Sequence, residues 1–99
     1  MTSRSVTVVN QLGMHARAAA RFVHLASRFH ARVRVARQGR EMDGKSIMGL
    51  LLLAATRGFT VTISADGIDE GDAVDALAAL VSGGFGEDEA MAASAEGAR

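Results

Sequence analysis

Phe59-Thr60-Val61-Thr62-Ile63-Ser64-Ala65 alternates apolar and polar residues almost without a break. This period of two predicts a β-strand whose buried face is made by Phe59, Val61, Ile63 and Ala65. The stretch Arg32–Arg37 alternates in the same way, with valines on one face and arginines on the other. Strands with a single apolar face are typical of an antiparallel sheet that is covered on one side only.

Working outward from these two strands, the hydrophobic spacing and the turn residues predict five more elements. They are strands at Ser5–Val9 and Arg40–Asp43, helices at Ala16–Phe29 and Ile47–Ala54, and a last helix that opens in the acidic cluster at 69–72 and stops at Ser82-Gly83-Gly84. The expected core stripes of the first and last helices are Ala19, Phe22, Val23 and Ala26, and Val74, Leu77, Ala78 and Val81. The order βαββαβα predicts an α+β fold, an open-faced two-layer sandwich with a four-stranded antiparallel sheet and three helices on one face.

The composition indicates one small globular domain. The chain has 99 residues, of which 48% are hydrophobic, and this suits a single core. We expect the domain to cover residues 1–88, and the Ala-, Glu-, Gly- and Ser-containing segment 89–99 to be a disordered tail. Cysteine is absent, so disulfides and thiolate chemistry are excluded. Without a signal-peptide pattern or an apolar run long enough for a bilayer, we expect a cytoplasmic protein that does not enter the membrane.

The charges balance in number but not in position along the chain. Eight of the eleven basic residues lie at or before position 40, and all eleven acidic residues follow it. This distribution suggests a basic end around His15 that attracts acidic partner surfaces. A small RNA-binding domain is one alternative, but a chain without tyrosine or tryptophan lacks the usual stacking platforms, so we expect no nucleic-acid partner.

The segment Gly13-Met14-His15-Ala16-Arg17 places a histidine where a predicted strand gives way to a predicted helix. A helix start offers unpaired N–H groups and partial positive charge to an anion. The guanidinium of Arg17 suits a phosphoryl group, and an imidazole is a nucleophile near neutral pH. Histidine is also an ordinary polar residue at a helix start, and Arg17 can equally be a solvated surface charge, so these five residues leave both interpretations open.

Three longer segments strengthen the functional interpretation. Asn10–Val23 resembles the active-site segment of HPr, the histidine-containing phosphocarrier of the bacterial phosphoenolpyruvate-dependent phosphotransferase system. Gly44–Ala55 resembles the family's regulatory serine region, and Phe59–Glu70 resembles its last strand and the entry to its last helix. The segments lie in the family's order, and the resemblance covers residues 4 to 88.

The resemblance implies that His15 accepts a phosphoryl group, on its δ1 nitrogen, from enzyme I or its nitrogen-branch counterpart and passes it to an enzyme II A-type domain. Arg17 would stabilise the charge during transfer. The chain would be a monomeric relay rather than an enzyme. We expect no metal and no cofactor, because the three histidines lack a metal-ligand spacing and the glycines lack a P-loop pattern. The alternative from another class is a regulatory binding module controlled by phosphorylation of Ser46.

Ser46 is a favoured residue to cap the second helix. Its surroundings also resemble the segment that HPr kinase/phosphorylase recognises, which makes regulatory phosphorylation our expectation. Next to it, Ile47, Met48 and Leu51 are candidates for an apolar partner-binding surface near His15. The competing interpretation assigns apolar residues of this helix to the core, and it fits Leu50 and Leu53 better.

One position departs from the common pattern of the family. Ala18 stands where the sugar-branch proteins usually have proline, and the segment Ala16–Ala20 looks like the nitrogen-branch relatives. The Ser82–Asp88 segment resembles their ending as well. We therefore place a nitrogen-branch or regulatory role above direct sugar transport.

Overall fold

The computed structural model describes residues 1–87, and the expected disordered tail, 89–99, lies outside them. Its elements are β1 (Thr2–Thr7), α1 (Ala16–Ala26), β2 (Arg32–Arg37), β3 (Arg40–Asp43), α2 (Ile47–Leu52), β4 (Thr60–Asp66), α3 (Glu70–Ser82) and the short 3-10 helix η1 (Gly84–Gly86). The predicted βαββαβα order is confirmed, and only η1 is an addition to it.

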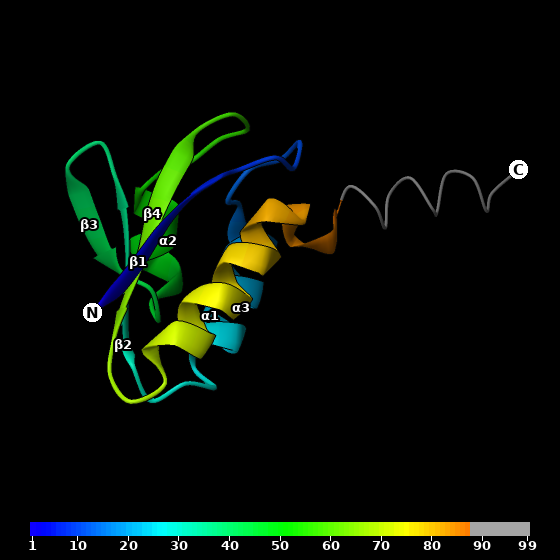
Figure 1. Cartoon of the computed structure of the whole chain (residues 1–99). Coiled ribbons are helices and arrows are strands. Elements are labelled where there is room, and N and C mark those ends of the chain that lie inside the picture. The colour runs from blue at the N-terminus through cyan, green and yellow to red at the C-terminus, as the bar shows by residue number, and fades with distance from the viewer. Residues whose placement is uncertain (88–99) are drawn as a thin grey trace, which may run out of the picture.

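The four strands form one antiparallel sheet in the order β1-β4-β2-β3. The two alternating stretches recognised in the sequence are therefore neighbours, and their apolar residues pair directly, Val35 with Ile63 and Val33 with Ala65. The helices pack on one face of this sheet (Figure 1). The predicted open-faced sandwich is confirmed.

The core lies between the sheet and the helices. All four predicted core residues of α3 are buried, as are Ala19, Phe22 and Ala26 of α1, whereas Val23 is only half-buried. The expected inward position of Phe59 is wrong. Its side chain is 37% exposed because β4 begins only at Thr60, and the Arg37 guanidinium lies 4.0 Å from the centroid of its ring. Phe59 has the periodicity of the buried face but stands beyond the end of the core.

The ends of three elements also differ from the prediction. β1 ends at Thr7, although Val8 still exchanges backbone hydrogen bonds with Gly58 and Phe59. α1 ends at Ala26 because the next turn tightens, with Phe29 donating to the Ala26 carbonyl three residues before it.

α2 ends at Leu52, two residues earlier than predicted. Ala54 follows with a φ of 51°, a left-handed conformation that terminates helices and that only glycine adopts without a steric penalty.

The start of α3 is tied to the rest of the sandwich by two carboxylates. Asp69 accepts hydrogen bonds from the backbone N–H groups of His30 and Ala31, both at 2.8 Å, and the His30 bond is the main reason that the pKa of Asp69 is lowered. Glu70 accepts from the Thr2 hydroxyl at 2.6 Å and from the Gly67 N–H at 3.2 Å. The N-terminal ammonium of Met1 lies 3.0 Å from the same carboxylate. The Thr2 bond above all, then the ammonium and the Gly67 bond, lower the pKa of Glu70 from 4.5 to about 2.

The lowered pKa of Glu70 predicts that the free energy of unfolding depends on pH in the acidic range. A carboxylate with a lowered folded pKa stabilises the fold above its unfolded pKa, and this contribution disappears as the pH falls from 4.5 to about 2. Glu70→Gln should therefore show a shallower fall of the thermal midpoint across this range than the unsubstituted chain. Asp72→Asn, which removes a charge from the same helical turn, is the control. An equally steep fall in Glu70→Gln would contradict the assignment.

Candidate functional site

His15 is the N-cap of α1, as its position in the sequence predicts. Its backbone is extended, with φ −82° and ψ −178°, and its carbonyl accepts the hydrogen bond of Ala19. Its ring Nδ1 accepts from the backbone N–H of Arg17 at 3.3 Å, slightly beyond the usual range for this bond. Nδ1 therefore faces the unpaired N–H groups at the positive end of α1.

A close backbone contact fixes where α1 begins. The Met14 N–H donates to the Ala55 carbonyl at 2.9 Å, which joins the loop before α1 to the segment after α2. At Gly13 the backbone has a φ of 67°, and a Cβ atom there would lie 2.7 Å from the Ala55 oxygen. Only glycine meets both conditions, so Gly13 is a structural requirement of the site as well as part of the motif.

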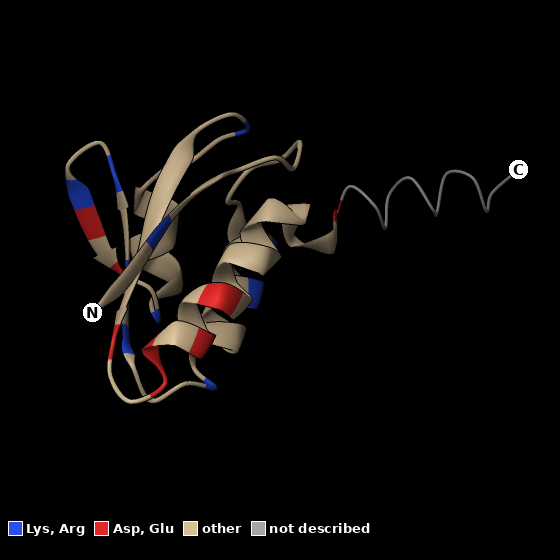
Figure 2. Ribbon diagram, viewed as in Figure 1, with Lys and Arg blue, Asp and Glu red and all other residues tan. Residues whose placement is uncertain are grey.

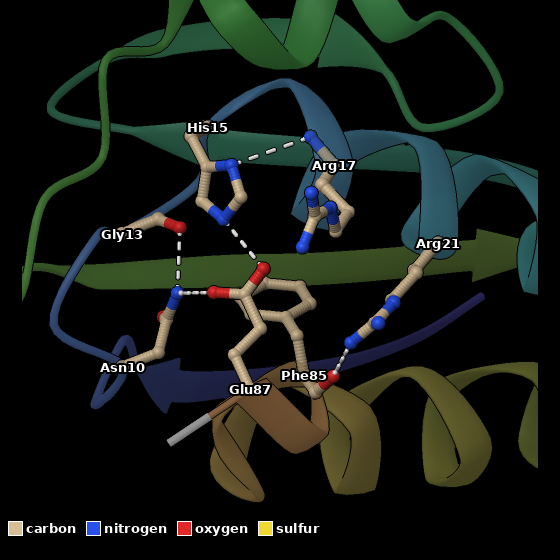
Figure 3. A network of polar contacts seen from close by, with 7 residues as sticks. All are labelled: Asn10, Gly13, His15, Arg17, Arg21, Phe85 and Glu87. Carbon is tan, nitrogen blue, oxygen red and sulfur yellow. Dashed lines mark hydrogen bonds and ion pairs between the residues drawn. The ribbon is translucent and has the colours of Figure 1, made fainter. Parts of the chain in front are cut away.

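A buried carboxylate lies on the other side of the imidazole. The Glu87 Oε2 atom is 2.5 Å from His15 Nε2 (Figure 3). The Glu87 side chain is 7% exposed, compared with 29% for that of His15. The second oxygen of Glu87 accepts from Asn10 Nδ2 at 2.9 Å, and the same nitrogen donates to the Gly13 carbonyl at 2.7 Å. His15 is thus held between the helix start and a carboxylate that follows η1.

The segment between α3 and Glu87 is anchored from α1. Arg21 donates from Nη1 to the Phe85 carbonyl at 2.5 Å, and the Phe85 side chain is buried in the core. Phe85 has a φ of 56°, an uncommon conformation for an aromatic residue. The anchored turn directs Glu87 back toward His15 (Figure 3).

Arg17 lies in the first turn of α1 and is exposed. Its backbone N–H contacts the His15 ring, and its side chain points back toward the space beside the imidazole and Glu87 (Figure 3). The structure thus brings together the two residues that the motif predicted, and it adds Asn10, Arg21 and Glu87 around them.

Ser46 is the N-cap of α2, as predicted. Its hydroxyl oxygen accepts from the Gly49 N–H at 3.0 Å, which satisfies one of the unpaired donors of this six-residue helix. The residue is half-buried. The capping role is sufficient to explain the serine structurally, so its modification stays a prediction.

The apolar residues of α2 divide between core and surface. Leu50 and Leu53 are completely buried, as expected, while Ile47 and Met48 are 42% and 68% exposed. Leu51 is partly buried against the core. Two further leucines are exposed, Leu52 in α2 and Leu12 in the loop before His15, at 51% and 60%.

Basic and acidic residues are less separated in the folded structure than their order in the sequence suggests. Figure 2 shows Lys and Arg spread over β1, β2, β3 and α1, and the acidic residues of α3 in its N-terminal half. Arginines 17 and 21 lie on α1 near the site, but Glu87 brings a carboxylate into it. The expected basic end around His15 is therefore only a local pair of arginines beside an acidic group.

Within residues 1–87, no group of three His, Cys, Asp or Glu side chains is arranged to hold a metal ion. His24 and His30 are exposed. In the same range, every helix is too short or too polar to cross a membrane.

Comparison with known proteins identifies the family. A family model described as "PTS HPr component phosphorylation site" matches residues 2–83. The chain belongs to the HPr family. Phosphocarrier protein HPr of Cupriavidus necator is 51% identical over 89 residues, 90% of this chain and 100% of that protein. Phosphocarrier protein NPr of Shewanella violacea is 40% identical over 84 residues, 85% of this chain and 92% of that protein.

Solved structures of HPr proteins have the same fold. HPr-C-His from Thermoanaerobacter tengcongensis superposes with a TM-score of 0.85 at 39% identity, covering 88% of this chain and 98% of that one. A crystal structure of the Bacillus subtilis protein Crh, a dimer with a swapped domain, has a TM-score of 0.69 at 42% identity, covering 85% of this chain and 97% of that one.

The sequence predicted only part of this candidate site. Asn10 lies inside the recognised segment, but nothing in its neighbourhood pairs it with a residue 77 positions away. Glu87 lies 72 positions from His15 and beyond the residues that the family model matches. The only available signal was the Gly-Gly-Phe-Gly segment before Glu87, because closely spaced glycines mark a turn of the chain.

Proposed function

We propose that this member of the HPr family is a phosphoryl relay in the cytoplasm. His15 would accept a phosphoryl group from phosphorylated enzyme I, or from its nitrogen-branch counterpart, and pass it to an enzyme II A-type domain. The observation that carries the proposal is the position of His15 Nδ1, which faces the N–H groups of the first turn of α1. The protein would accept phosphate from enzyme I and donate it to the enzyme II A-type domain, and it would turn over no small molecule by itself.

The chemistry needs little besides position and charge. The Nδ1–P bond forms while the N–P bond to the donor histidine breaks, so the phosphoryl group moves between two imidazoles of similar chemistry. The 3.3 Å bond from the Arg17 N–H to Nδ1 is long enough to yield to the incoming group. The phosphoryl oxygens would then accept from the N–H groups at the helix start, and the Arg17 guanidinium would offset their charge.

The partners are expected to dock around His15 on the exposed apolar residues. Ile47 and Met48 expose much of their side chains, and Leu51 supports them from a partly buried position. A few buried residues supply most of the affinity of an interface, and methionine is among the residue types enriched there. We propose the monomer as the active form.

The branch is proposed on local sequence features. Ala18 is completely buried in the first turn of α1, where it takes the place of the proline usual in the sugar branch. The relatives include proteins named HPr and one named NPr, so overall identity alone does not choose between the branches. We propose a nitrogen-branch or regulatory role.

The direct test is phosphorylation by purified enzyme I of each branch with phosphoenolpyruvate, followed by intact-mass analysis. The unsubstituted chain should gain one acid-labile phosphoryl group, and His15→Ala should gain none, because it lacks the nucleophile. His24→Ala and His30→Ala are matched controls, since both histidines are exposed. Full labelling of His15→Ala by either donor would refute the relay site.

Arg17 has a separate prediction. If its guanidinium stabilises the transferring group, Arg17→Ala should slow transfer about 10- to 1,000-fold, the scale of one lost electrostatic contact. Arg28→Ala, an exposed arginine outside α1, is the matched control. The measurement is the rate of phosphate uptake from enzyme I. Equal rates for the two variants would show that Arg17 is only a solvated surface charge with no role in transfer.

Ser46 is proposed as a regulatory switch modified by an HPr kinase/phosphorylase. A phosphate adds a charge of about −1.5 to −2, and the start of α2 can accept it without unfolding. Acidic partner surfaces would be repelled. The alternative function, a binding module controlled by Ser46, would use the same modification but would not need His15 and Arg17.

The charge mechanism predicts that Ser46→Asp keeps a near-normal thermal midpoint and takes phosphate from enzyme I more slowly. The defect should shrink at high salt, because exposed charges are screened. Ser46→Asn, which keeps a capping side chain without the charge, is the control. A defect that is equal in the two variants, or that does not respond to salt, would contradict the mechanism.

A further inference from the structure

Glu87 is the one carboxylate in contact with the candidate nucleophile among the described residues. Its side chain is 7% exposed, and an ionised carboxylate is costly to bury unless it is hydrogen-bonded. Both of its oxygens have partners, Oε1 with Asn10 Nδ2 at 2.9 Å and Oε2 with His15 Nε2 at 2.5 Å. The carboxylate is therefore a built part of the site rather than a surface residue beside it.

The contacts on the two ring nitrogens assign the proton of His15. An ionised carboxylate only accepts hydrogen bonds, so Nε2 must be the donor in its contact with Glu87. On the other side of the ring, Nδ1 faces a backbone N–H, which can only donate, so Nδ1 carries no proton. The two contacts agree on one neutral tautomer, with the proton on Nε2 and a lone pair on Nδ1.

We infer that Glu87 is a positioning residue for phosphoryl transfer, which holds His15 in the Nε2–H tautomer and keeps the Nδ1 lone pair available for attack. The inference rests on the proposed relay function. As the Nδ1–P bond forms and the donor N–P bond breaks, Nε2 keeps its proton and the ring becomes positively charged. The Glu87 carboxylate faces that charge, so no proton has to leave or enter during the step. Buried carboxylates orient and stabilise catalytic histidines in the same manner in serine hydrolases.

The surroundings of Glu87 show how the carboxylate is held. Asn10 Nδ2 uses both of its hydrogens, one toward Glu87 Oε1 and one toward the Gly13 carbonyl. This links the carboxylate to the loop that carries His15. The Arg21 bond to the Phe85 carbonyl and the buried Phe85 ring fix the turn that precedes Glu87. Figure 3 shows Glu87 between Asn10 and His15, so that a move of the carboxylate disturbs both contacts.

The same contacts make Glu87→Gln an informative substitution. The glutamine oxygen must face Asn10, which presents only donors there, so the glutamine NH₂ group faces His15 Nε2. An NH₂ group donates, and it would favour the lone pair on Nε2 and the proton on Nδ1. The substitution therefore keeps the size of the side chain, while it favours the opposite tautomer of the His15 ring.

The first measurement is ¹⁵N NMR of the His15 imidazole at a pH where the ring is neutral, and it does not depend on phosphate transfer. The unsubstituted chain should show Nε2 almost fully protonated, and Glu87→Gln should show an increased share of Nδ1–H. Glu41→Gln, which removes one charge from exposed β3, should leave the tautomer unchanged. A mainly Nδ1-protonated ring in the unsubstituted chain would overturn the inference without any variant, and so would an unaltered tautomer in a folded Glu87→Gln.

The second measurement is the rate of phosphate uptake from enzyme I. Loss of a carboxylate that orients a metal-bound histidine typically costs about 10- to 100-fold. We expect a loss on this scale for Glu87→Gln but not for Glu41→Gln. Glu87→Asp, which keeps the charge with a shorter reach, should recover part of both the tautomer and the rate. A changed tautomer with an unchanged rate would overturn the role in transfer. If the unsubstituted chain takes no phosphate, the relay function itself fails, and the NMR result still decides the pairing of Glu87 with His15.

Discussion

The functional site depends on a backbone contact between two loops. The Met14 N–H donates to the Ala55 carbonyl at 2.9 Å, and Gly13 lies so close to the same carbonyl that a methyl group would not fit. This contact holds the end of α2 against the beginning of α1. It sets the residue at which α1 starts, and because of it the next residue, His15, becomes the N-cap with its ring directed across the first turn. A different starting residue would point the imidazole elsewhere.

Once His15 is placed, its two nitrogens have different environments. The helix start supplies N–H groups on the Nδ1 side, and Glu87 supplies a negative charge on the Nε2 side. An anion is favoured at the first and a positive ring at the second, which is the charge distribution of a phosphorylated imidazole that keeps its proton. Local charge around one ring therefore explains the proposed relay better than the overall balance of charge does.

The fold was predictable because its signals are local and repeated. The alternation in Arg32–Arg37 and the apolar stripe of α3 depend on neighbours within one element, so both were predicted correctly. The prediction that Phe59 is buried was wrong because the alternating pattern of the sequence continues past the point where the core ends. Glu87 was missed because its partner lies 72 residues away, and a charged residue that follows a glycine-rich turn carries no local sign of burial. The motif predicted His15 and Arg17, but only the fold brings the carboxylate to them.

The central claim is that Nδ1 of His15 is the atom that carries the phosphoryl group while Nε2 keeps its proton against Glu87. The most direct measurement is a long-range ¹H–¹⁵N correlation spectrum, with ³¹P coupling, of the chain phosphorylated by enzyme I. The account predicts phosphorus coupled to Nδ1 of a single imidazole and a proton on Nε2 of the same ring. Phosphorus on Nε2, or on any residue other than His15, would contradict it.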